Sequence, residues 1–348
     1  MKCVRVFLFV VCGFNIALVS MDAPPSAYKP LSIIEAKVKN ISFITPCIFA
    51  ISTPLSPQLI LYELKSKKPK AAIKCDGPVN SISQCDNFKK IAAACYDIVY
   101  IFDIQTGQQV QRYKTNSQRV NSVHAHPNGE NIFVSGAQNK TVKVWDLRSP
   151  IVKQIYSEHE DAVTMVRASG NKSYFVSSSE DKTTKIWDWN SIESHHTIRN
   201  VSPKDITYNS QGNTFMTCTY YAYRYDALSA ALLATFNRTG TKEVRGSKIK
   251  DTSALYSCAS TGVDDHELLA IGTDDGKMVL FNPENSKALP TVVQAFASPL
   301  DALAFCPNGN CLVAGSSKEQ KVQVYELSNK KDSPILSKRV SLKNSCIP

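Results

Sequence analysis

The sequence predicts an all-β protein built from one unit that is repeated seven times. The mark of the repeat is a short apolar run that ends in an aromatic residue followed by an acid or an amide. Such pairs follow one another at intervals of 40, 43, 42, 38, 56 and 44 residues. The seven pairs are Tyr62-Glu63, Phe102-Asp103, Trp145-Asp146, Trp187-Asp188, Tyr225-Asp226, Phe281-Asn282 and Tyr325-Glu326. A period of about 40–45 residues ending in Trp-Asp is typical of one blade of a β-propeller. Because a single blade cannot bury its own apolar face, it must stack on a neighbour, and we predict a seven-bladed ring.

The chain is long enough for one such ring and little else. It has 348 residues, of which 43% are apolar and 9% aromatic, a composition typical of a globular core. Seven blades take up most of this length, so the repeat overrides the two domains that length alone favours. We predict a single propeller domain over residues 31–342, with residues 1–20 outside it as a signal-like or upstream extension.

Each blade is expected to contain four antiparallel strands, and blade 4 shows the pattern most clearly. Its first three strands are expected at 162–169, 174–179 and 184–189, where the side chains alternate and are often β-branched or aromatic. Turn residues, Gly170-Asn171 and Asp181-Lys182, separate them. The other blades give corresponding segments at 41–45, 47–52 and 57–64 (blade 1), 80–88, 90–97 and 98–107 (blade 2), 120–129, 131–136 and 142–149 (blade 3), 204–210, 213–221 and 223–229 (blade 5), 254–265, 267–276 and 277–284 (blade 6), and 300–309, 310–317 and 320–328 (blade 7).

Two segments stand apart from the regular repeat. Blade 7 needs an outer strand from one of the chain ends, and both 31–38 and 335–342 have a suitable pattern. The long fifth interval holds a polar, glycine-bearing stretch at 237–251, which predicts a surface loop. That loop carries four cations that we regard as candidate partner-binding residues: Lys242, Arg245, Lys248 and Lys250.

Residues 31–342 resemble the WD-repeat family. In that family a His before the first strand, a Ser or Thr on the second strand, an Asp in the following turn and the Trp form a buried hydrogen-bonded network. The matching residues of blade 4 are His159, Ser177, Asp181 and Trp187, with Glu158 in place of the usual Gly. The resemblance implies that this Ser/His/Asp set stabilises the fold and is not a catalytic triad. In blade 3 the turn position holds Asn139 and no His precedes the first strand, so the network there is expected to be incomplete.

The motifs of common catalytic and metal sites are missing from the sequence. No glycine-rich phosphate loop, GxSxG elbow, HExxH motif or calcium-binding loop occurs. His124, His126 and the Asp274-Asp275-Gly276 turn do not have metal-ligand spacing with cysteines and are interpreted as strand and turn residues. We therefore predict a protein that is not an enzyme, with no catalytic residues, no cofactor, no metal site and no small-molecule substrate.

The favoured function is that of a scaffold or adaptor that binds other proteins within a multiprotein complex. Residues 79–149 also resemble the propeller subunit of the TOR kinase complex. Residues 132–148 resemble the Trp-Asp-x-Arg box of substrate receptors of cullin–RING ubiquitin ligases, except that Asn139 replaces an Asp, and this resemblance implies that Arg148 contacts an adaptor protein. A net charge of +10 leaves a third reading open, in which the ring binds RNA or a ribonucleoprotein.

The compartment is expected to be the cytoplasm or the nucleus. The chain has 11 dispersed cysteines, an odd number, which favours free thiols in a reducing environment. Residues 1–20 nevertheless resemble a signal peptide, with Lys2 and Arg5 before a short apolar run, so the secretory route stays open. That run is too short to predict a stable membrane span. Sequons begin at Asn40, Asn139, Asn171, Asn200 and Asn237.

Overall fold

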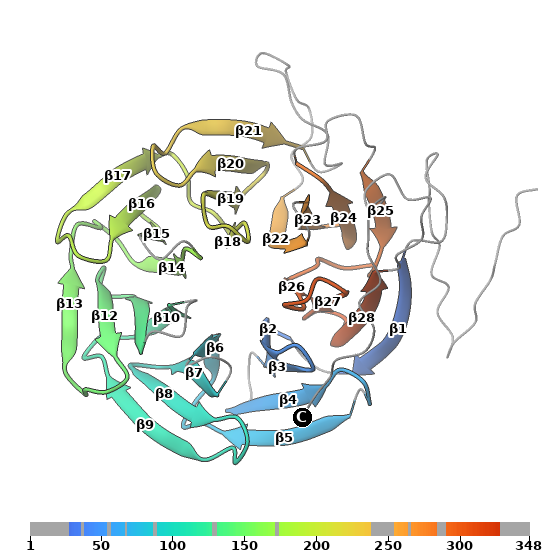
Figure 1. Ribbon diagram of the computed structural model, residues 1–348, viewed down its shortest axis with the longest axis horizontal. Coiled ribbons are helices and arrows are strands. Elements are labelled where there is room, and N and C mark those ends of the chain that lie inside the picture. Colours follow the sequence, from blue (N-terminus) through green and yellow to red (C-terminus); the bar gives the residue numbers. More distant parts are fainter. Residues whose placement is uncertain are drawn as a thin grey trace, which may run out of the picture.

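The computed structural model describes residues 28–35, 38–53, 57–66, 68–85, 89–126, 131–170, 174–237, 254–263, 266–283 and 290–327. These residues form 28 β-strands and no helix, in seven four-stranded antiparallel sheets arranged as a ring (Figure 1). Within the described residues there is accordingly no helix long and apolar enough to cross a membrane. The predicted all-β, seven-bladed propeller is confirmed.

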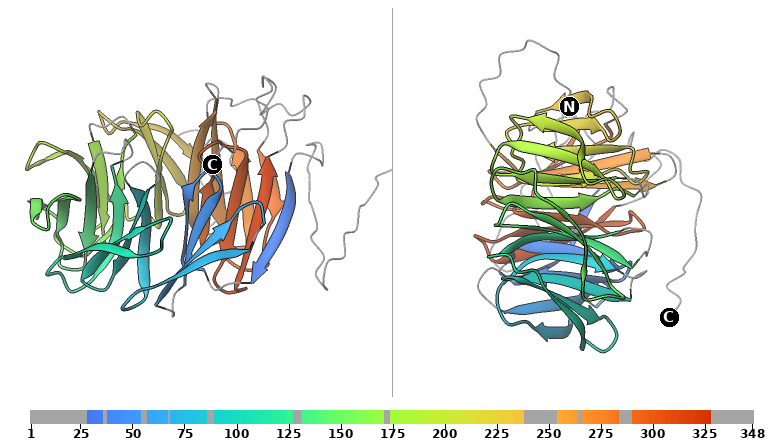
Figure 2. Two further views of the ribbon diagram at one scale, coloured as in Figure 1. Left: turned by 60° about the horizontal axis from the view of Figure 1, so that its bottom comes forward. Right: turned by 90° about the vertical axis from the view of Figure 1, so that its left-hand side faces the viewer.

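In blades 1 to 6 the four strands follow one another in chain order from the centre of the ring to its outside (Figures 1 and 2). Blade 1 contains β2 (Asn40–Thr45), β3 (Ile48–Ser52), β4 (Gln58–Glu63) and β5 (Pro69–Lys74). Blade 2 contains β6 (Val79–Cys85), β7 (Lys90–Cys95), β8 (Ile98–Asp103) and β9 (Gln109–Lys114). Blade 3 contains β10 (Val120–Ala125), β11 (Ile132–Ala137), β12 (Val142–Asp146) and β13 (Val152–Tyr156). Blade 4 contains β14 (Val163–Ala168), β15 (Tyr174–Ser179), β16 (Thr183–Asp188) and β17 (Ser194–Arg199).

The remaining blades repeat the same order up to the point where the ring closes. Blade 5 contains β18 (Asp205–Tyr208), β19 (Thr214–Cys218), β20 (Ala222–Asp226) and β21 (Leu232–Phe236). Blade 6 contains β22 (Leu255–Val263), β23 (His266–Thr273), β24 (Lys277–Phe281) and β25 (Thr291–Gln294). Blade 7 contains β26 (Ala302–Phe305), β27 (Cys311–Ser316) and β28 (Lys321–Leu327), and its outer strand is β1 (Tyr28–Glu35).

The N-terminal segment therefore closes the ring. Strand β1 pairs antiparallel with β28, from Tyr28 opposite Leu327 to Glu35 opposite Lys321. Strand β1 covers the outer edge of β28, which would otherwise be left unpaired. Of the two closing segments considered from the sequence, 31–38 overlaps this strand, which begins three residues earlier, at Tyr28. The other, 335–342, lies outside the described residues, as does the extension at 1–20.

The hydrophobic core lies between neighbouring blades. Each sheet is covered on both faces, so its second strand is almost wholly buried, as in β3 and β7. Between blades 3 and 4, Val134 and Val144 pack with Val163, Val166 and Trp187 in one buried cluster. The packing there is so close that a Cβ built on Gly136 would lie 2.5 Å from Val163 Cγ1. Any larger residue at 136 would push the two blades apart.

Polar side chains on the first strands also tie blades together. Asp205 of blade 5 accepts hydrogen bonds from Arg167 Nη2 of blade 4 at 3.2 Å and from the Cys258 amide of blade 6 at 3.0 Å. Burial raises the pKa of the Asp205 carboxyl, and the nearby Arg167 guanidinium opposes that rise. A single carboxylate thus links three successive blades.

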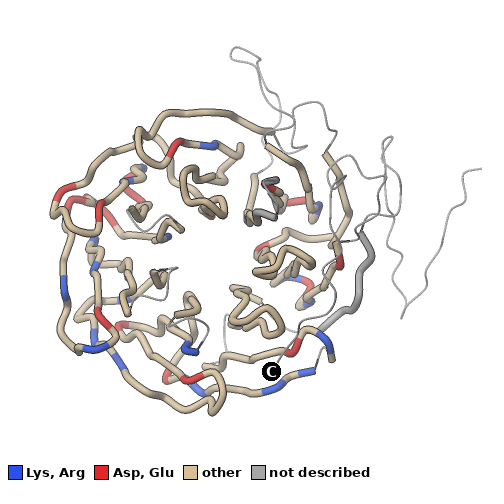
Figure 3. The backbone as a smooth tube through the Cα atoms, in the orientation of Figure 1, with Lys and Arg blue, Asp and Glu red and all other residues tan. Residues whose placement is uncertain are grey.

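Charged residues are spread around the ring. Figure 3 shows Lys and Arg in separate sectors, with Asp and Glu among them. Exposed lysines occur on blade 1 at Lys65, Lys68, Lys70 and Lys74. Within the described residues, the positive charge therefore does not collect on one blade.

Candidate functional site

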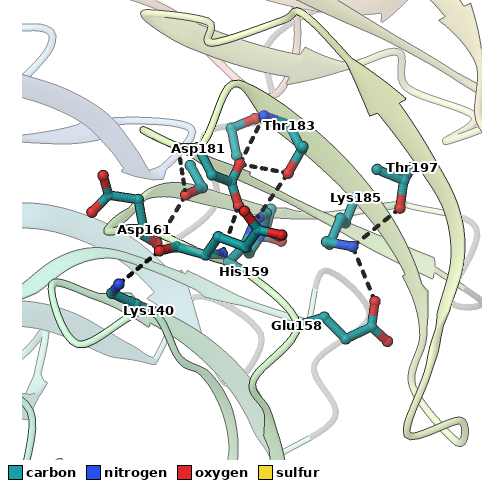
Figure 4. Close-up of polar contacts among 12 residues, drawn as sticks. Lys140, Glu158, His159, Asp161, Asp181, Thr183, Lys185 and Thr197 are labelled. Carbon is teal, nitrogen blue, oxygen red and sulfur yellow. Dashed lines mark hydrogen bonds and ion pairs between the residues drawn. The ribbon is translucent and has the colours of Figure 1, made fainter.

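The four residues of the predicted network come from adjacent parts of blade 4. His159 precedes β14, Ser177 lies in β15, Asp181 lies in the turn between β15 and β16, and Trp187 lies in β16. The β15–β16 hairpin pairs Ser177 with Lys185 and Phe175 with Trp187, which places the indole beside the serine. Figure 4 shows His159 and Asp181 facing each other in the close-up of this blade.

The side chains form one unbroken chain of hydrogen bonds. Trp187 Nε1 donates to Ser177 Oγ at 2.7 Å. Ser177 Oγ lies 2.7 Å from His159 Nε2, and His159 Nδ1 lies 2.8 Å from Asp181 Oδ2. A neutral imidazole with its proton on Nδ1 satisfies every partner: Ser177 donates to Nε2 and Nδ1–H donates to the carboxylate. Because each buried polar group has a partner, the network specifies one arrangement of the blade.

Asp181 accepts further hydrogen bonds that hold its turn. The Glu160 amide donates to Oδ2 at 2.9 Å, and the amide and hydroxyl of Thr183 donate to Oδ1 at 2.8 and 2.6 Å. Burial favours the protonated carboxyl, but the hydrogen bonds from Thr183, Glu160 and His159 outweigh it and lower the pKa of Asp181 to about 2. Burial also lowers the pKa of His159, against the opposing effect of Asp181. The pair is therefore a carboxylate and a neutral imidazole at neutral pH.

This arrangement has the residue types of a catalytic triad but not its accessibility. Ser177 and Trp187 are both 0% exposed, and the side chain of Asp181 is 6% exposed. The Trp187 indole N–H donates a hydrogen bond to the Ser177 hydroxyl oxygen, which is the atom that a nucleophilic serine would present to a substrate. The cluster can fix the positions of β15, β16 and the segment before β14, but it cannot bring Ser177 into contact with a substrate.

Blade 3 contains only part of the same network. Trp145 Nε1 donates to Ser135 Oγ at 2.8 Å, as the equivalent pair does in blade 4. In the turn, Asn139 Oδ1 accepts a hydrogen bond from Thr141 at 2.8 Å. Ser117 stands where blade 4 has His159, and its hydroxyl bonds to the Thr115 carbonyl. The Trp–Ser bond is thus shared by both blades, while the His–Asp link belongs to blade 4.

Glu158 belongs to a second cluster that the sequence did not reveal. Its carboxylate accepts hydrogen bonds from the Ser194 amide at 2.7 Å and the Ser194 hydroxyl at 2.6 Å. Lys185 Nζ lies 3.0 Å from Glu158 Oε2 and 3.1 Å from Thr197 Oγ1 (Figure 4). These contacts pin the outer strand β17 to β16. The replacement of Gly by Glu158 was visible in the sequence, but its partners come from strands 27 and 36 residues further along the chain.

The acid of the repeated pair shapes the loop after the third strand in blades 3, 4 and 5. In each of these blades, Oδ1 of the acid accepts a hydrogen bond from the backbone amide two residues further on. The pairs are Asp146 with Arg148 at 2.9 Å, Asp188 with Asn190 at 2.7 Å, and Asp226 with Leu228 at 3.1 Å. Such side-chain bonds to the amide two residues on are typical of tight turns. The acid therefore fixes the same loop in blades 3, 4 and 5, and all three loops emerge at the same end of the ring.

Those loops present exposed apolar residues and an arginine. Ile151 is 72% exposed, Ile192 69% and Leu228 56%. The Arg148 side chain is 72% exposed and binds Asp146 through Nε at 2.9 Å and Nη2 at 2.6 Å. Asp146 in turn raises the pKa of Arg148, chiefly through this side-chain hydrogen bond, so the guanidinium is permanently charged. We refer to Arg148, Ile151, Ile192 and Leu228 as the blade 3–5 rim.

Among the other residues considered from the sequence, His124 and Asp275 lie away from this rim. Lys242, Arg245, Lys248 and Lys250 lie outside the described residues. His124 is partly buried in β10, where burial lowers its pKa to about 3 and its Nδ1 accepts the Ala168 amide at 3.2 Å. Asp275 binds its own turn neighbours, Thr273 and Lys277, each at 2.5 Å. In the part of the chain that the structure describes, no three His, Cys, Asp or Glu residues gather as metal ligands.

Comparisons with known proteins agree with the fold. A family model described as WD domain, G-beta repeat, matches residues 107–146 and 151–188. Human Protein NEDD1 is 27% identical over 204 residues, which is 56% of this chain and 28% of that protein. The U3 small nucleolar RNA-associated protein 15 homolog of Xenopus tropicalis is 28% identical over 129 residues, or 36% of this chain and 24% of that protein. The WD repeat-containing protein pop1 of Schizosaccharomyces pombe is 25% identical over 111 residues, or 30% of this chain and 14% of that protein.

The similarity to these relatives is therefore partial. The matched region spans only 14–28% of the length of each. The repeat match falls in blades 3 and 4, where the Trp–Ser hydrogen bond is present in both. The chain thus contains WD repeats at residues 107–146 and 151–188, within a ring of seven four-stranded blades.

Proposed function

We propose that this propeller is a non-catalytic scaffold or adaptor that binds other proteins as part of a multiprotein complex. WD-repeat propellers are typically non-catalytic. The observation that carries the proposal is the blade 3–5 rim, where three large aliphatic side chains on equivalent loops point to solvent. Ile151 lies three residues from Arg148, and aliphatic residues exposed at the equivalent loop of three neighbouring blades give a partner repeated apolar contacts.

The polar groups of blade 4 support this assignment by elimination. His159, Ser177 and Asp181 satisfy one another and leave no reactive group at the surface. The blade 3–5 rim instead presents aliphatic side chains and a guanidinium, which are groups that bind a protein surface and do not act as nucleophiles or general bases. Arg148 is held by Asp146, so little rotamer freedom is lost when a partner covers it.

Replacing the apolar residues of the rim should abolish partner capture. For the triple variant Ile151→Asp, Ile192→Asp, Leu228→Asp we expect at least a tenfold loss of the captured proteins, because burying an unpaired carboxylate in an interface is strongly unfavourable. The measurement is affinity purification followed by quantitative mass spectrometry. Tyr220→Asp is the matched control, since Tyr220 is 60% exposed but lies in the β19–β20 loop, at the other end of the blade. Full capture by the triple variant would exclude the rim as the binding surface.

The cullin–RING alternative is a narrower form of the same proposal and depends on Arg148. It proposes that the guanidinium contacts the adaptor of a ubiquitin ligase. Arg148→Ala would then remove ligase subunits from the captured set while the other proteins stay bound.

An RNA or ribonucleoprotein partner is the second candidate function. It is supported by the net charge of +10 and by the similarity to a protein named for its association with the U3 small nucleolar RNA. Exposed Lys65, Lys68 and Lys70 between β4 and β5 would contribute to a basic surface.

Charge reversal of the basic loop separates the two candidates. We expect the variant with Lys242, Arg245, Lys248 and Lys250 changed to Glu to capture less protein, because like-signed surfaces slow association with an acidic partner. This loss should be unchanged when the lysate is first treated with ribonuclease. If the RNA candidate holds, ribonuclease alone removes the captured set, and retention of the parent on an RNA column falls steeply with salt.

We also propose that the protein acts in the cytoplasm or the nucleus. All eight cysteines in the described residues are in the reduced form. Asn40, the first sequon, is engaged by its neighbours, with Nδ2 donating to Asn80 O at 2.7 Å and to Ser52 Oγ at 3.1 Å. Glycan on Asn200, which is exposed, would contradict this location.

A further inference from the structure

Two cysteines face each other across a tight turn in blade 7. Cys306 follows β26 and Cys311 begins β27, with Pro307, Asn308, Gly309 and Asn310 between them. The hairpin pairs Phe305 with Leu312, and the Cys306 amide donates to the Cys311 carbonyl at 2.9 Å. The two cysteines are therefore directly opposite one another. Opposed residues of this kind have Cα atoms about 5.5 Å apart, within the range that a disulfide spans.

The Cys306 sulfur lies in a cradle of hydrogen-bond donors. The Cys311 amide donates to Cys306 Sγ at 2.9 Å, and the thiol itself donates to Asn308 Oδ1 at 2.6 Å. The Cys311 thiol and the amides of Asn308 and Asn310 also bond to this sulfur. The amide donors stabilise a thiolate in the way that a helix N-terminus does, whereas the Asn308 Oδ1 acceptor favours the protonated thiol.

This cradle makes the two thiols unequal. The hydrogen bond from the Cys311 thiol, helped by the backbone amides and opposed by burial, lowers the pKa of Cys306 to about 7. The same bond and burial raise the pKa of Cys311. The lowered pKa makes Cys306 the more readily ionised of the two thiols, which is the division between an attacking and a resolving thiol.

The blade geometry alone does not require cysteines at this turn. The same amide-to-carbonyl bond joins Ser169 and Tyr174 in blade 4 at 2.9 Å, and Asn209 and Thr214 in blade 5 at 3.0 Å. In blade 7 the pair lies directly beneath the turn, with Cys306 1% and Cys311 4% exposed, while Pro307, Asn308 and Asn310 are exposed. Reaction at the sulfur therefore requires this short surface turn to open.

We propose that Cys306 and Cys311 form a reversible thiol–disulfide site that reacts with small-molecule disulfides such as oxidised glutathione. The Cys306 thiolate attacks one sulfur of the glutathione disulfide, a mixed disulfide forms, and one glutathione thiolate leaves. Cys311 then loses its proton to water and attacks Cys306 Sγ, which forms the Cys306–Cys311 bond and releases the second glutathione thiolate. Two protein thiols are oxidised and one small-molecule disulfide is reduced to two thiols.

The full-length protein, incubated with oxidised glutathione and then alkylated and digested, tests the site by mass spectrometry. We expect a Cys306–Cys311 disulfide to form first and to disappear on addition of reduced glutathione. The internal control is the pair Cys218 and Cys258, which is equally buried, at 0% and 4% exposed, but lies in strands β19 and β22 of two different blades and not in one hairpin. Burial raises the pKa of Cys258, so we expect this pair to remain reduced in the presence of oxidised glutathione. Its two thiols should react with the alkylating reagent only after the protein is denatured.

Two variants test the order of attack. Cys311→Ser should stop at a glutathione adduct on Cys306, and Cys306→Ser should leave Cys311 unmodified. If Cys306 of the parent protein stays reduced while other cysteines are oxidised, the proposal is overturned. This outcome is measured on the parent protein, so it does not depend on whether the variants fold. An adduct on Cys311 in the Cys306→Ser variant would also overturn it.

Discussion

Replacing Trp187 with Ala is expected to lower the free energy of unfolding by about 3–5 kcal/mol, the range for a fully buried large aromatic side chain. The indole is 0% exposed and packs against Tyr156 with ring centroids 4.8 Å apart and against Phe175 at 6.2 Å. Its removal leaves a cavity between blades 3 and 4 and takes away the donor to Ser177. Chemical denaturation monitored by far-UV circular dichroism, which reports the backbone and not the indole, measures the loss of stability.

Trp187→Phe is the matched control for this substitution. It keeps most of the apolar surface but removes Nε1, so a smaller loss of about 1–3 kcal/mol is expected from the unsatisfied Ser177 oxygen and the lost volume. Equal losses for the Ala and Phe variants would show that the hydrogen bond, and not packing, dominates at this position.

Replacing Asp181 with Ala has the second largest expected effect, a loss of about 1–3 kcal/mol. The substitution leaves His159 Nδ1, the Glu160 amide and the Thr183 amide without their acceptor. Asp181→Asn keeps one oxygen and should lose less. A variant with the stability of the parent would show that the network does not stabilise blade 4.

The same carboxylate predicts how stability depends on pH. Its pKa of about 2 in the folded protein lies below the value of about 3.9 for an unfolded chain. A depressed carboxyl pKa stabilises the fold above the unfolded value, and this contribution is lost as the pH falls from about 4 to about 2. The lowered pKa of His159 acts in the same direction, because the unfolded histidine takes up a proton first on acidification. The difference in stability between the parent and Asp181→Ala should therefore shrink at low pH.

The ring itself was predictable because the repeat is a local and recurrent signal. The aromatic-acid pairs recur at the end of each third strand, and the acid fixes the next loop through bonds to amides only two residues away. The resemblance to WD repeats also identified the four members of the blade 4 network, whose contacts lie within one hairpin and the segment before it.

The features that escaped the sequence depend on residues far apart in the chain. Glu158 reaches Ser194 across the blade, and Asp205 joins blades 4 and 6, and neither contact has a local pattern. The choice of closing strand also depends on which chain end reaches β28. The blade 3–5 rim required knowledge of which apolar residues stay exposed, since Ile151 and Val144 look equally apolar in the sequence but differ entirely in burial.

The central claim is that the polar network of blade 4 serves the fold while the rim serves binding. It is tested most directly by measuring thermal unfolding and partner capture side by side for Asp181→Ala and for the triple rim variant. We predict that Asp181→Ala lowers Tm but captures the full partner set at a temperature where it is folded, whereas the rim variant keeps its Tm and loses the partners. A folded Asp181→Ala protein that loses its partners, or a rim variant that keeps them, would contradict the account.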